Sequence, residues 1–159
     1  MEQFTSILCF VKELERLKTV TRTAWTTTGR RESTAEHSWR LSVFAGLMCT
    51  MMPELDRENV LMTALIHDLG EIYTGDVSAA LLPDPDEKYE EEKQAVQKLF
   101  SLLDEPARTQ LYTLWQDYEN GRTAEARFVR ALDKAETIIQ HNQGVKMCIR
   151  DSSIMGAAA

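Results

Sequence analysis

The sequence predicts an all-α fold, a compact bundle of about six or more helices. Apolar side chains recur at helical spacing along almost the whole chain, and neither a strand pair nor an internal repeat is visible. The length of 159 residues corresponds to one domain and is sufficient to bury a hydrophobic core.

The first helix is predicted over about residues 3–18, because apolar side chains follow i, i+3, i+4, i+7 spacing there. These side chains are Phe4, Ile7, Leu8, Val11, Leu14 and Leu17. Residues 19–33 are rich in threonine and favour an irregular loop. Ser33 and Glu36 have the spacing of a capping box, so a second helix should begin after Ser33 and end near Met52.

The remaining helices follow from the same rules. Asp56 is the expected N-cap of a third helix over "RENVLMTALIHDLGEI", with Gly70 near its end. The stretch "YTGDVSAALLPDPDE" contains two prolines and is predicted to be a loop. Helical spacing resumes over about residues 86–103, 106–119 and 123–142.

Charge and cysteine content narrow the classes of function. The formal net charge is −7, from 25 acidic and 18 basic residues, which argues against binding to nucleic acid or an anionic membrane. Cys9, Cys49 and Cys148 are odd in number and lack CxxC spacing, which favours free thiols in a reducing compartment. No signal-like stretch and no run of roughly 18 apolar residues is visible. We therefore expect a cytoplasmic protein with no nucleic-acid or membrane partner.

The last residues depart from the helical pattern. The stretch "MCIRDSSIMGAAA" has no helical periodicity, and "MCIRDS" resembles the translation of a transposon-end adapter used to prepare sequencing libraries. We therefore expect a domain over residues 1–146 that is truncated at its C-terminal end, followed by a non-native tail over residues 147–159.

Metal-competent side chains stand on or beside the inward faces of three predicted helices: His37, His67, Asp68 and Asp133. Taken alone, His37 is compatible with a satisfied core histidine as well as with a ligand, and the macrodipole favours His67 at a helix C-terminus. Asp133 beside Lys134 would ordinarily be a solvated pair. Buried ionisable groups are costly, however, unless they are paired or bind metal. Together the four residues indicate a metal centre, and imidazole with carboxylate suits Zn, Mn, Fe, Co or Ni.

The order of these residues resembles the H…HD…D signature of the HD-domain superfamily of metal-dependent phosphohydrolases. Three segments carry the resemblance: "ESTAEHSWRLS", "ALIHDLGEIYTGD" and "ALDKAE". The resemblance covers residues 5–143, nearly the whole predicted domain. More narrowly, the chain resembles the branch typified by bacterial 5′-deoxynucleotidases and their eukaryotic relatives, which remove the phosphate from deoxyribonucleoside 5′-monophosphates.

The resemblance implies one divalent transition metal, or Mg, as cofactor, held by His37, His67, Asp68 and Asp133. It implies that Glu71 activates or orients the nucleophilic water and that Asp76 lies near the scissile phosphate. Arg22 matches an arginine that contacts the phosphate, and Trp25 an aromatic residue that packs against sugar or base. The bacterial enzyme places its tryptophan directly after the arginine, where this chain has Thr23. This departure leaves the choice between ribose and deoxyribose open.

The implied function is a metal-dependent phosphohydrolase that removes the 5′-phosphate from (deoxy)ribonucleoside 5′-monophosphates by attack of metal-bound water. Two alternatives stay open. The same site could act on a nucleoside triphosphate, a cyclic nucleotide or an alarmone, or the chain could be a non-catalytic helical module that binds metal or nucleotide. Members of the branch are often dimeric, and the apolar helix faces are compatible with a homodimer.

Overall fold

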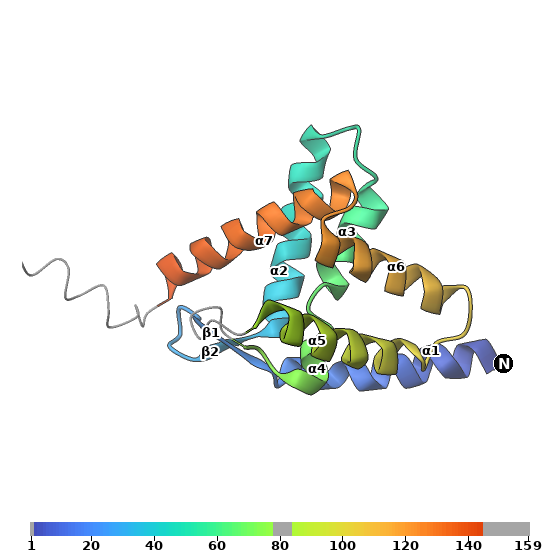
Figure 1. Ribbon diagram of the computed structural model, residues 1–159. Coiled ribbons are helices and arrows are strands. Elements are labelled where there is room, and N and C mark those ends of the chain that lie inside the picture. The colour runs from blue at the N-terminus through green and yellow to red at the C-terminus, as the bar shows by residue number, and fades with distance from the viewer. Residues whose placement is uncertain (1, 78–83, 145–159) are drawn as a thin grey trace, which may run out of the picture.

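Helices make up most of the structure, a computed structural model that describes residues 2–77 and 84–144 (Figure 1). The α-helices are α1 (Glu2–Glu13), α2 (Thr34–Met48), α3 (Arg57–Ile66), α4 (Glu71–Thr74), α5 (Pro85–Phe100), α6 (Ala107–Asn120) and α7 (Ala124–Gln143). Two short 3₁₀ segments, η1 (Leu14–Lys18) and η2 (Cys49–Met51), follow α1 and α2. The predicted all-α bundle is confirmed, apart from one small sheet of strands β1 (Thr21–Trp25) and β2 (Arg31–Ser33).

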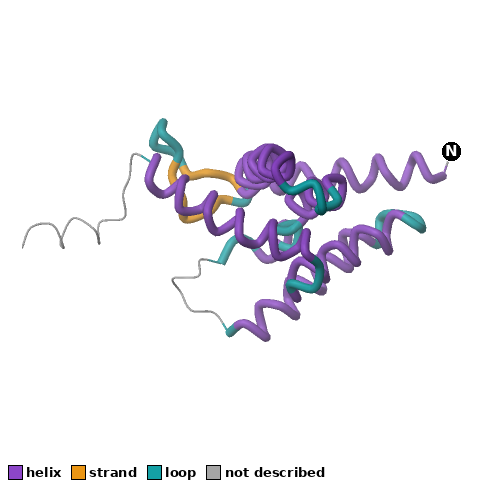
Figure 2. Tube along the Cα trace, turned by 90° about the horizontal axis from the view of Figure 1, so that it is seen from above, coloured by secondary structure: helices purple, strands orange, loops and turns teal. Residues whose placement is uncertain are grey.

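Helix α3 lies at the centre of the bundle. It contacts α2, α6 and α7, and α2 also contacts α7, so these elements enclose a common interior. In Figure 1, α7 crosses α2, while α1 and α5 run alongside each other in a lower layer. The view from above shows the two strands beside one end of α7 (Figure 2). The segments that carry the predicted metal ligands are therefore neighbours in space.

The predicted start of α2 is confirmed by its cap. The hydroxyl of Ser33 accepts a hydrogen bond from the backbone N–H of Glu36 at 3.3 Å, and the backbone N–H of Ser33 donates to the Glu36 carboxylate at 2.9 Å. These two bonds satisfy polar groups that a helix end otherwise leaves without intrahelical partners. Asp56 likewise caps α3, as predicted, by accepting from the backbone of Glu58 and Asn59. The two caps fix where helices α2 and α3 begin.

The stretch predicted as an irregular loop, residues 19–33, instead contains an antiparallel hairpin. Strand β1 pairs with β2 in the register Thr21↔Ser33 and Trp25↔Arg31, with an irregularity between these two pairs. The irregular register and the long polar connection leave no clear alternation of apolar and polar residues, so the sequence did not reveal the strands.

Contacts outside the hairpin stabilise it. The side-chain amide of Gln140 on α7 donates to the backbone carbonyl of Trp25 at 2.6 Å, and the N–H of Thr34 donates to the carbonyl of Val20 at 2.9 Å. Gly29, in the connection, has a φ of 81°, a left-handed conformation that glycine adopts without strain. An isolated two-stranded hairpin is marginal in water, so its attachment to α7 is what allows this short sheet to persist.

The predicted third helix is interrupted. Helix α3 ends at Ile66 and α4 begins only at Glu71, so the prediction of one helix over residues 57–72 is wrong. Gly70 in the intervening turn lies against α5, where a β-carbon on Gly70 would stand 3.0 Å from the Cβ of Glu92. This close approach is a tertiary contact that local spacing cannot reveal. The His67–Asp68 pair therefore follows α3, rather than occupying its last turn.

Two clusters of buried apolar side chains form the core. The first joins α1, α3, α4, α5 and α6: Phe10, Leu17, Ile66, Leu69, Ile72, Val96, Leu99, Phe100, Leu103 and Trp115. The second joins α2, α3, α6 and α7: Leu41, Ala45, Cys49, Val60, Ala64, Tyr118, Val129 and Leu132. Because α3 contributes to both clusters, the turn that follows it is held between them. Burial of each large aliphatic side chain stabilises the fold by about 1.5–3 kcal/mol.

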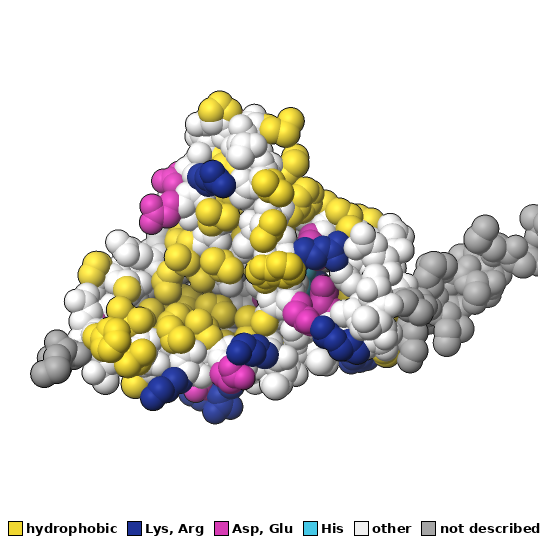
Figure 3. Space-filling view, turned by 180° about the vertical axis from the view of Figure 1, so that it is seen from behind, with side chains coloured by type: hydrophobic (Ala, Val, Ile, Leu, Met, Phe, Trp, Pro, Cys, Tyr) yellow, Lys and Arg dark blue, Asp and Glu magenta, His cyan; other side chains and the backbone are white. Residues whose placement is uncertain are grey.

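One face of the molecule is rich in exposed apolar side chains (Figure 3). The stripe predicted on the first helix is divided, because Leu17 is buried while Phe4 is 66% exposed. Further exposed large apolar side chains on α1, α2 and α3 are Ile7, Leu8, Val11, Trp39, Val43, Leu47, Met62 and Leu65. A groove of about 400 Å³ runs between η1, α2 and α3 on this face.

Some predictions fall on residues outside the described ranges. The expected non-native tail, residues 147–159, lies there, as does Cys148. Cys9 and Cys49 lie within the described ranges and are free thiols, as predicted. Across residues 2–77 and 84–144, no helix is both long enough and apolar enough to cross a membrane.

Candidate metal centre

Three separate segments bring the four predicted ligands together. His37 comes from α2, His67 and Asp68 from the turn after α3, and Asp133 from α7. The Nε2 atom of His37 lies 3.0 Å from Oδ1 of Asp133 and 3.8 Å from Oδ2 of Asp68. The Nε2 atom of His67 lies 3.1 Å from the same Asp68 oxygen, and the two imidazole centroids are 5.4 Å apart.

This arrangement suits a metal ion. Ligand atoms of His37, His67 and Asp133 all lie within 4.8 Å of one another. Nε2 of each histidine is buried and has no hydrogen-bond partner among the described residues. Burying a polar atom without a partner costs free energy, and a cation between the two imidazoles would remove that cost. Two imidazoles with carboxylates form a donor set that fits a divalent transition metal.

The other ring nitrogen of each histidine is held by the protein. Nδ1 of His67 lies 3.0 Å from the backbone carbonyl of Ala64, one turn earlier. Nδ1 of His37 lies 2.6 Å from a carboxylate oxygen of Glu136, which is buried on α7. With Nδ1 donating to these acceptors, Nε2 of both rings is left free to bind a metal. The sequence "ALDKAE" contains Glu136, but sequence reasoning gave this residue no role.

The charges around the centre shift the pKa values of its residues. Burial alone would lower the pKa of His37, but the close Asp133 carboxylate, the hydrogen bond to Glu136 and the charge of Asp68 outweigh it and raise that pKa to about 9. Burial would raise the pKa of Asp68 and Asp133, yet the neighbouring histidines hold both below their ordinary value. Asp68 and Asp133 are therefore held as ionised carboxylates, which favour bound positive charge.

Glu71 is a buried carboxyl group beside the four candidate ligands. It is the first residue of α4, and one of its carboxylate oxygens accepts a hydrogen bond from the Thr34 hydroxyl at 2.8 Å. Burial, followed by the charges of Asp68 and Asp76, raises the pKa of Glu71 to about 9. Asp76 follows Gly75 after α4 and is half-buried. The structure thus brings both predicted catalytic carboxylates into the electrostatic surroundings of the centre.

Arg22 also reaches the centre, from strand β1. Its Nη1 lies 3.3 Å from Oδ2 of Asp68, and its Nη2 donates to the Thr137 hydroxyl at 3.1 Å. Its Nε lies 3.6 Å from the buried carboxylate of Glu32. Burial alone would lower the pKa of Arg22, but Asp68 and the other carboxylates raise it above its ordinary value. A permanent positive charge therefore stands beside the candidate ligands.

Trp25 lies three positions further along β1, and its surroundings differ. The Arg31 guanidinium stands over its ring, 5.9 Å from the centroid, and its backbone carbonyl binds Gln140. The structure therefore places Trp25 in the hairpin beside the end of α7, whereas Arg22 reaches the Asp68 carboxylate.

Sequence reasoning missed Tyr118 on α6. Its hydroxyl donates to Oδ2 of Asp133 at 3.1 Å, and its ring lies edge-on to His67 with 5.1 Å between centroids. Burial and the charge of Asp133 raise its pKa above the ordinary value, so it stays a donor. No sequence spacing links Tyr118 to Asp133, because the contact arises only when α6 packs on α7.

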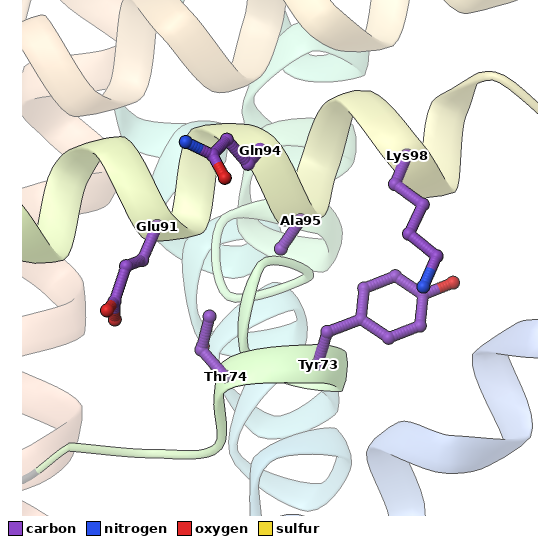
Figure 4. A pocket seen from close by; sticks show the side chains of 6 residues that line it. All are labelled: Tyr73, Thr74, Glu91, Gln94, Ala95 and Lys98. Atoms are coloured by element: carbon purple, nitrogen blue, oxygen red, sulfur yellow. The ribbon is translucent and has the colours of Figure 1, made fainter.

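A second hollow lies away from the candidate ligands, between α4 and α5 (Figure 4). Its volume is about 410 Å³, and its lining residues are Tyr73, Thr74, Glu91, Gln94, Ala95 and Lys98. Lys98 crosses above the Tyr73 ring, with its ammonium 4.2 Å from the centroid. None of the predicted site residues lines this hollow.

The fold and the candidate centre define a class: all-α proteins in which histidines and aspartates from separate helical segments converge on one metal site. The HD domain family model matches residues 14–154 of this chain. The chain belongs to the HD domain family, which confirms the family resemblance inferred from the motifs.

Individual relatives agree with this assignment. The chain is 38% identical over 137 residues to the 5′-deoxynucleotidase HDDC2 of Xenopus laevis, covering 85% of this chain and 67% of that protein. It is 36% identical over 140 residues to the 5′-deoxynucleotidase HDDC2 of Homo sapiens, covering 87% and 68% respectively. The crystal structure of a predicted metal-dependent phosphohydrolase from Magnetospirillum magnetotacticum MS-1 superposes with a TM-score of 0.81 at 34% identity, covering 90% of this chain and 74% of that one.

Proposed function

We propose that the protein is a metal-dependent phosphohydrolase that removes the 5′-phosphate from (deoxy)ribonucleoside 5′-monophosphates. One observation carries the proposal: two buried imidazole nitrogens, which have no hydrogen-bond partner within residues 2–77 and 84–144, face carboxylates, and the Arg22 guanidinium stands beside them. A cation with a guanidinium is the combination that recognises a phosphate ester. Relatives at 34–38% identity that carry the name 5′-deoxynucleotidase support the same substrate class.

We propose that His37, His67, Asp68 and Asp133 hold one divalent cation. Mn, Co, Zn, Fe, Ni and Mg are the candidates, because the donor set alone does not choose among them. When bound, such a cation lowers the pKa of a coordinated water and neutralises charge on the phosphoryl oxygens. The protein contributes a fixed geometry, since each ligand comes from a helix, or the end of a helix, that is anchored in the core.

Arg22 is assigned to hold the phosphate. Its planar guanidinium can bind two phosphoryl oxygens at once, which a point charge cannot do. Asp68, Thr137 and Glu32 hold it in place before substrate arrives, so little side-chain entropy is lost on binding. Trp25, in the same hairpin, is assigned to pack against the sugar or base. The hairpin would then supply both contacts to the parts of the substrate that do not react.

Glu71 and Asp76 are assigned to the proton transfers. Hydrolysis requires a proton to leave the attacking water and a proton to reach the departing 5′ oxygen. Glu71, held at one oxygen by Thr34, would orient the water. The positive charge of a bound cation would favour the ionised form of Glu71 over the neutral acid of the metal-free site, and this carboxylate would take the proton of the water. Asp76 would position the water or return a proton to the leaving group. General acid–base assistance of this kind is worth about 10²–10⁴-fold in rate.

Phosphate release tests the proposal directly. The purified protein is stripped with a chelator, reloaded with Mn²⁺, Co²⁺, Zn²⁺ or Mg²⁺, and assayed with dAMP, dGMP, dTMP, AMP and an aryl phosphate. We expect metal-dependent release from the nucleotides that is abolished in Asp68→Ala. A higher rate with deoxyribonucleotides identifies a deoxynucleotidase, whereas equal rates identify a nucleotidase indifferent to the sugar. No release of phosphate by a folded, metal-loaded protein would refute the proposal.

A further inference from the structure

We infer that Glu136 is a positioning residue for the metal centre, which orients the imidazole of His37 from the opposite helix. The inference rests on the metal site of the proposed function. Its starting point is a single contact: Oε2 of Glu136 lies 2.6 Å from Nδ1 of His37. Both side chains are buried, with exposed fractions of 1% for Glu136 and 0% for His37. Water therefore cannot replace this hydrogen bond.

The location of Glu136 favours a functional role over simple packing. A buried carboxylate costs several kcal/mol of desolvation and is seldom retained without compensation. Here the compensation is incomplete, because Oε1 of Glu136 has no hydrogen-bond partner among the described residues and lies 3.3 Å from Nε of Arg40 as a looser ion pair. The well-formed contact of this carboxylate is the one with His37. The buried Glu136 carboxylate therefore interacts mainly with the imidazole of His37.

The position of Glu136 on α7 adds to the argument. Glu136 follows Asp133 by three residues, so the two carboxylates project from the same face of the helix, one turn apart. Asp133 reaches Nε2 of His37, and Glu136 reaches Nδ1 of the same ring. Helix α7 therefore contacts the imidazole at both nitrogens. One contact stands where the metal would bind, and the other fixes the orientation of the ring.

The two histidines are not equivalent in this respect. Nδ1 of His67 meets a neutral backbone carbonyl, that of Ala64, at 3.0 Å. Nδ1 of His37 meets a carboxylate. A charged acceptor strengthens the hydrogen bond and makes Nε2 of the same ring a better electron-pair donor to a metal. Loss of such an outer partner typically lowers metal affinity about 10–100-fold. His37 is thus the ligand whose strength depends most on a second side chain.

Arg40 supports Glu136 but does not depend on it. Arg40 stands one turn after His37 on α2, and its guanidinium binds the side-chain oxygens of Gln140 and Gln143 in addition to facing Glu136. Replacing Glu136 therefore leaves Arg40 with partners and partial exposure to solvent. This permits a test of Glu136 without stranding a buried positive charge.

The test measures metal affinity and the hydrogen position on His37, neither of which requires turnover. Glu136→Met keeps the length of the side chain and removes the acceptor, Glu136→Gln keeps a neutral acceptor, and Glu32→Gln is the matched control. Glu32 is also a buried glutamate, but its ion pair is with Arg22, and among the described residues it makes no hydrogen bond to an imidazole. Zn²⁺ affinity is measured by competition with a chromophoric chelator. Long-range ¹H–¹⁵N spectra, simplified by the presence of 3 histidines, report which ring nitrogen carries the hydrogen.

We expect Glu136→Met to bind Zn²⁺ about 10–100-fold more weakly than the parent protein, with a smaller loss in Glu136→Gln and a smaller loss still in Glu32→Gln. In the Zn²⁺-loaded parent, we expect the His37 hydrogen on Nδ1. In metal-free Glu136→Met, we expect a mixture of rings that carry the hydrogen on Nδ1 and rings that carry it on Nε2. If Glu136→Met does not fold, the comparison of Glu136→Gln with Glu32→Gln decides. Equal affinity in all variants, or equal losses in the Glu136 and Glu32 variants, overturns the inference.

The outcomes separate this inference from the proposed function. If the parent protein binds one Zn²⁺ and the Glu136 variants bind it more weakly, but no nucleotide is hydrolysed, the positioning role stands and the proposed function fails. If nucleotides are hydrolysed and the variants bind Zn²⁺ as tightly as the parent, the function stands and the positioning role fails. Failure of the folded parent protein to bind any divalent cation overturns both.

Discussion

The guanidinium of Arg22 lies 3.3 Å from a carboxylate oxygen of Asp68, although 46 positions separate them in the sequence. This contact joins the β-hairpin to the turn that carries the His-Asp pair. Asp68 thus faces two kinds of positive charge: the guanidinium on one side and, in the proposed function, a cation on the other. The charge of a phosphate bound between the guanidinium and the cation would be neutralised by both.

We expect Arg22→Lys to lower kcat/KM about 10–100-fold, because lysine keeps the charge but cannot bind two phosphoryl oxygens with one planar group. Most of the loss should appear as a higher KM if Arg22 contributes mainly to substrate binding. Steady-state kinetics on the best nucleotide substrate measure the effect. Arg30→Lys, in the same hairpin but exposed and paired with Glu36, is the matched control and should leave both constants unchanged. Equal effects of the two substitutions would contradict the assigned role of Arg22.

We expect Tyr118→Phe to weaken the metal centre without unfolding the protein. The substitution removes the hydroxyl that donates to Asp133 at 3.1 Å and preserves the ring packed beside His67. Loss of a partner of a candidate ligand should lower metal affinity by about 10-fold. Chelator competition measures the change. Tyr112→Phe removes a hydroxyl bound to Gln97 and Gln116, away from the centre, and should leave metal affinity as it was.

The metal-free protein should become less stable as the pH rises from about 6.5 to 9. The pKa of His37 is raised from 6.5 to about 9, and that of Glu71 from 4.5 to about 9. Each group binds its proton more tightly in the folded state than in the unfolded chain. Its contribution to stability is therefore complete below the ordinary pKa and is lost as the pH passes through about 9.

The unfolding temperature of chelator-treated protein, measured from pH 6 to 10, checks this expectation. Saturating Zn²⁺ should reduce the decline, because a cation replaces the proton on His37. An unfolding temperature that stays constant or rises across this range in the metal-free protein would contradict the pKa shifts of His37 and Glu71.

We expect Gly70→Ala to destabilise the fold by about 1–3 kcal/mol, although alanine is ordinarily the better helix residue. A β-carbon at this position would meet Cβ of Glu92 at 3.0 Å and its Cγ at 3.2 Å, so α5 would have to shift. Urea unfolding measures the loss. Because the turn before Gly70 carries His67 and Asp68, metal affinity should fall as well. A variant that is as stable as the parent would show that α5 yields more easily than the contact indicates.

The candidate ligands could be found from the sequence because their residue types are informative. His37 and His67 are two of only 3 histidines in the chain, and each falls within an otherwise apolar helical pattern. Asp133 shares a face of its predicted helix with Val129 and lies beside Leu132, both of which are buried. Local spacing was sufficient to predict that these residues lie on or beside inward faces, and the structure buries both histidines and partly buries Asp133.

The residues that orient the ligands could not be found in this way. Tyr118 and Glu136 become partners of Asp133 and His37 only through the packing of α6 and α2 on α7. The break before Gly70 and the β-hairpin were missed for the same reason, since each depends on a contact between distant segments. Patterns within one element predict its type and its buried face, but the partner of each side chain is set by the whole fold.

Helix α7 makes two separate contacts: Gln140 donates a hydrogen bond to the carbonyl of Trp25 in the hairpin, and Asp133 lies beside His37. The helix geometry fixes the angle between these two side chains. Asp133 and Gln140 are seven residues apart, nearly two full turns, and so project from nearly the same side of the helix. One residue inserted between them would rotate the following turns by about 100° relative to Asp133. The helix could then keep either the contact of Asp133 with His37 or the hydrogen bond of Gln140 to Trp25, but not both. In members of this family, the segment between these two positions should therefore tolerate substitutions far better than insertions or deletions.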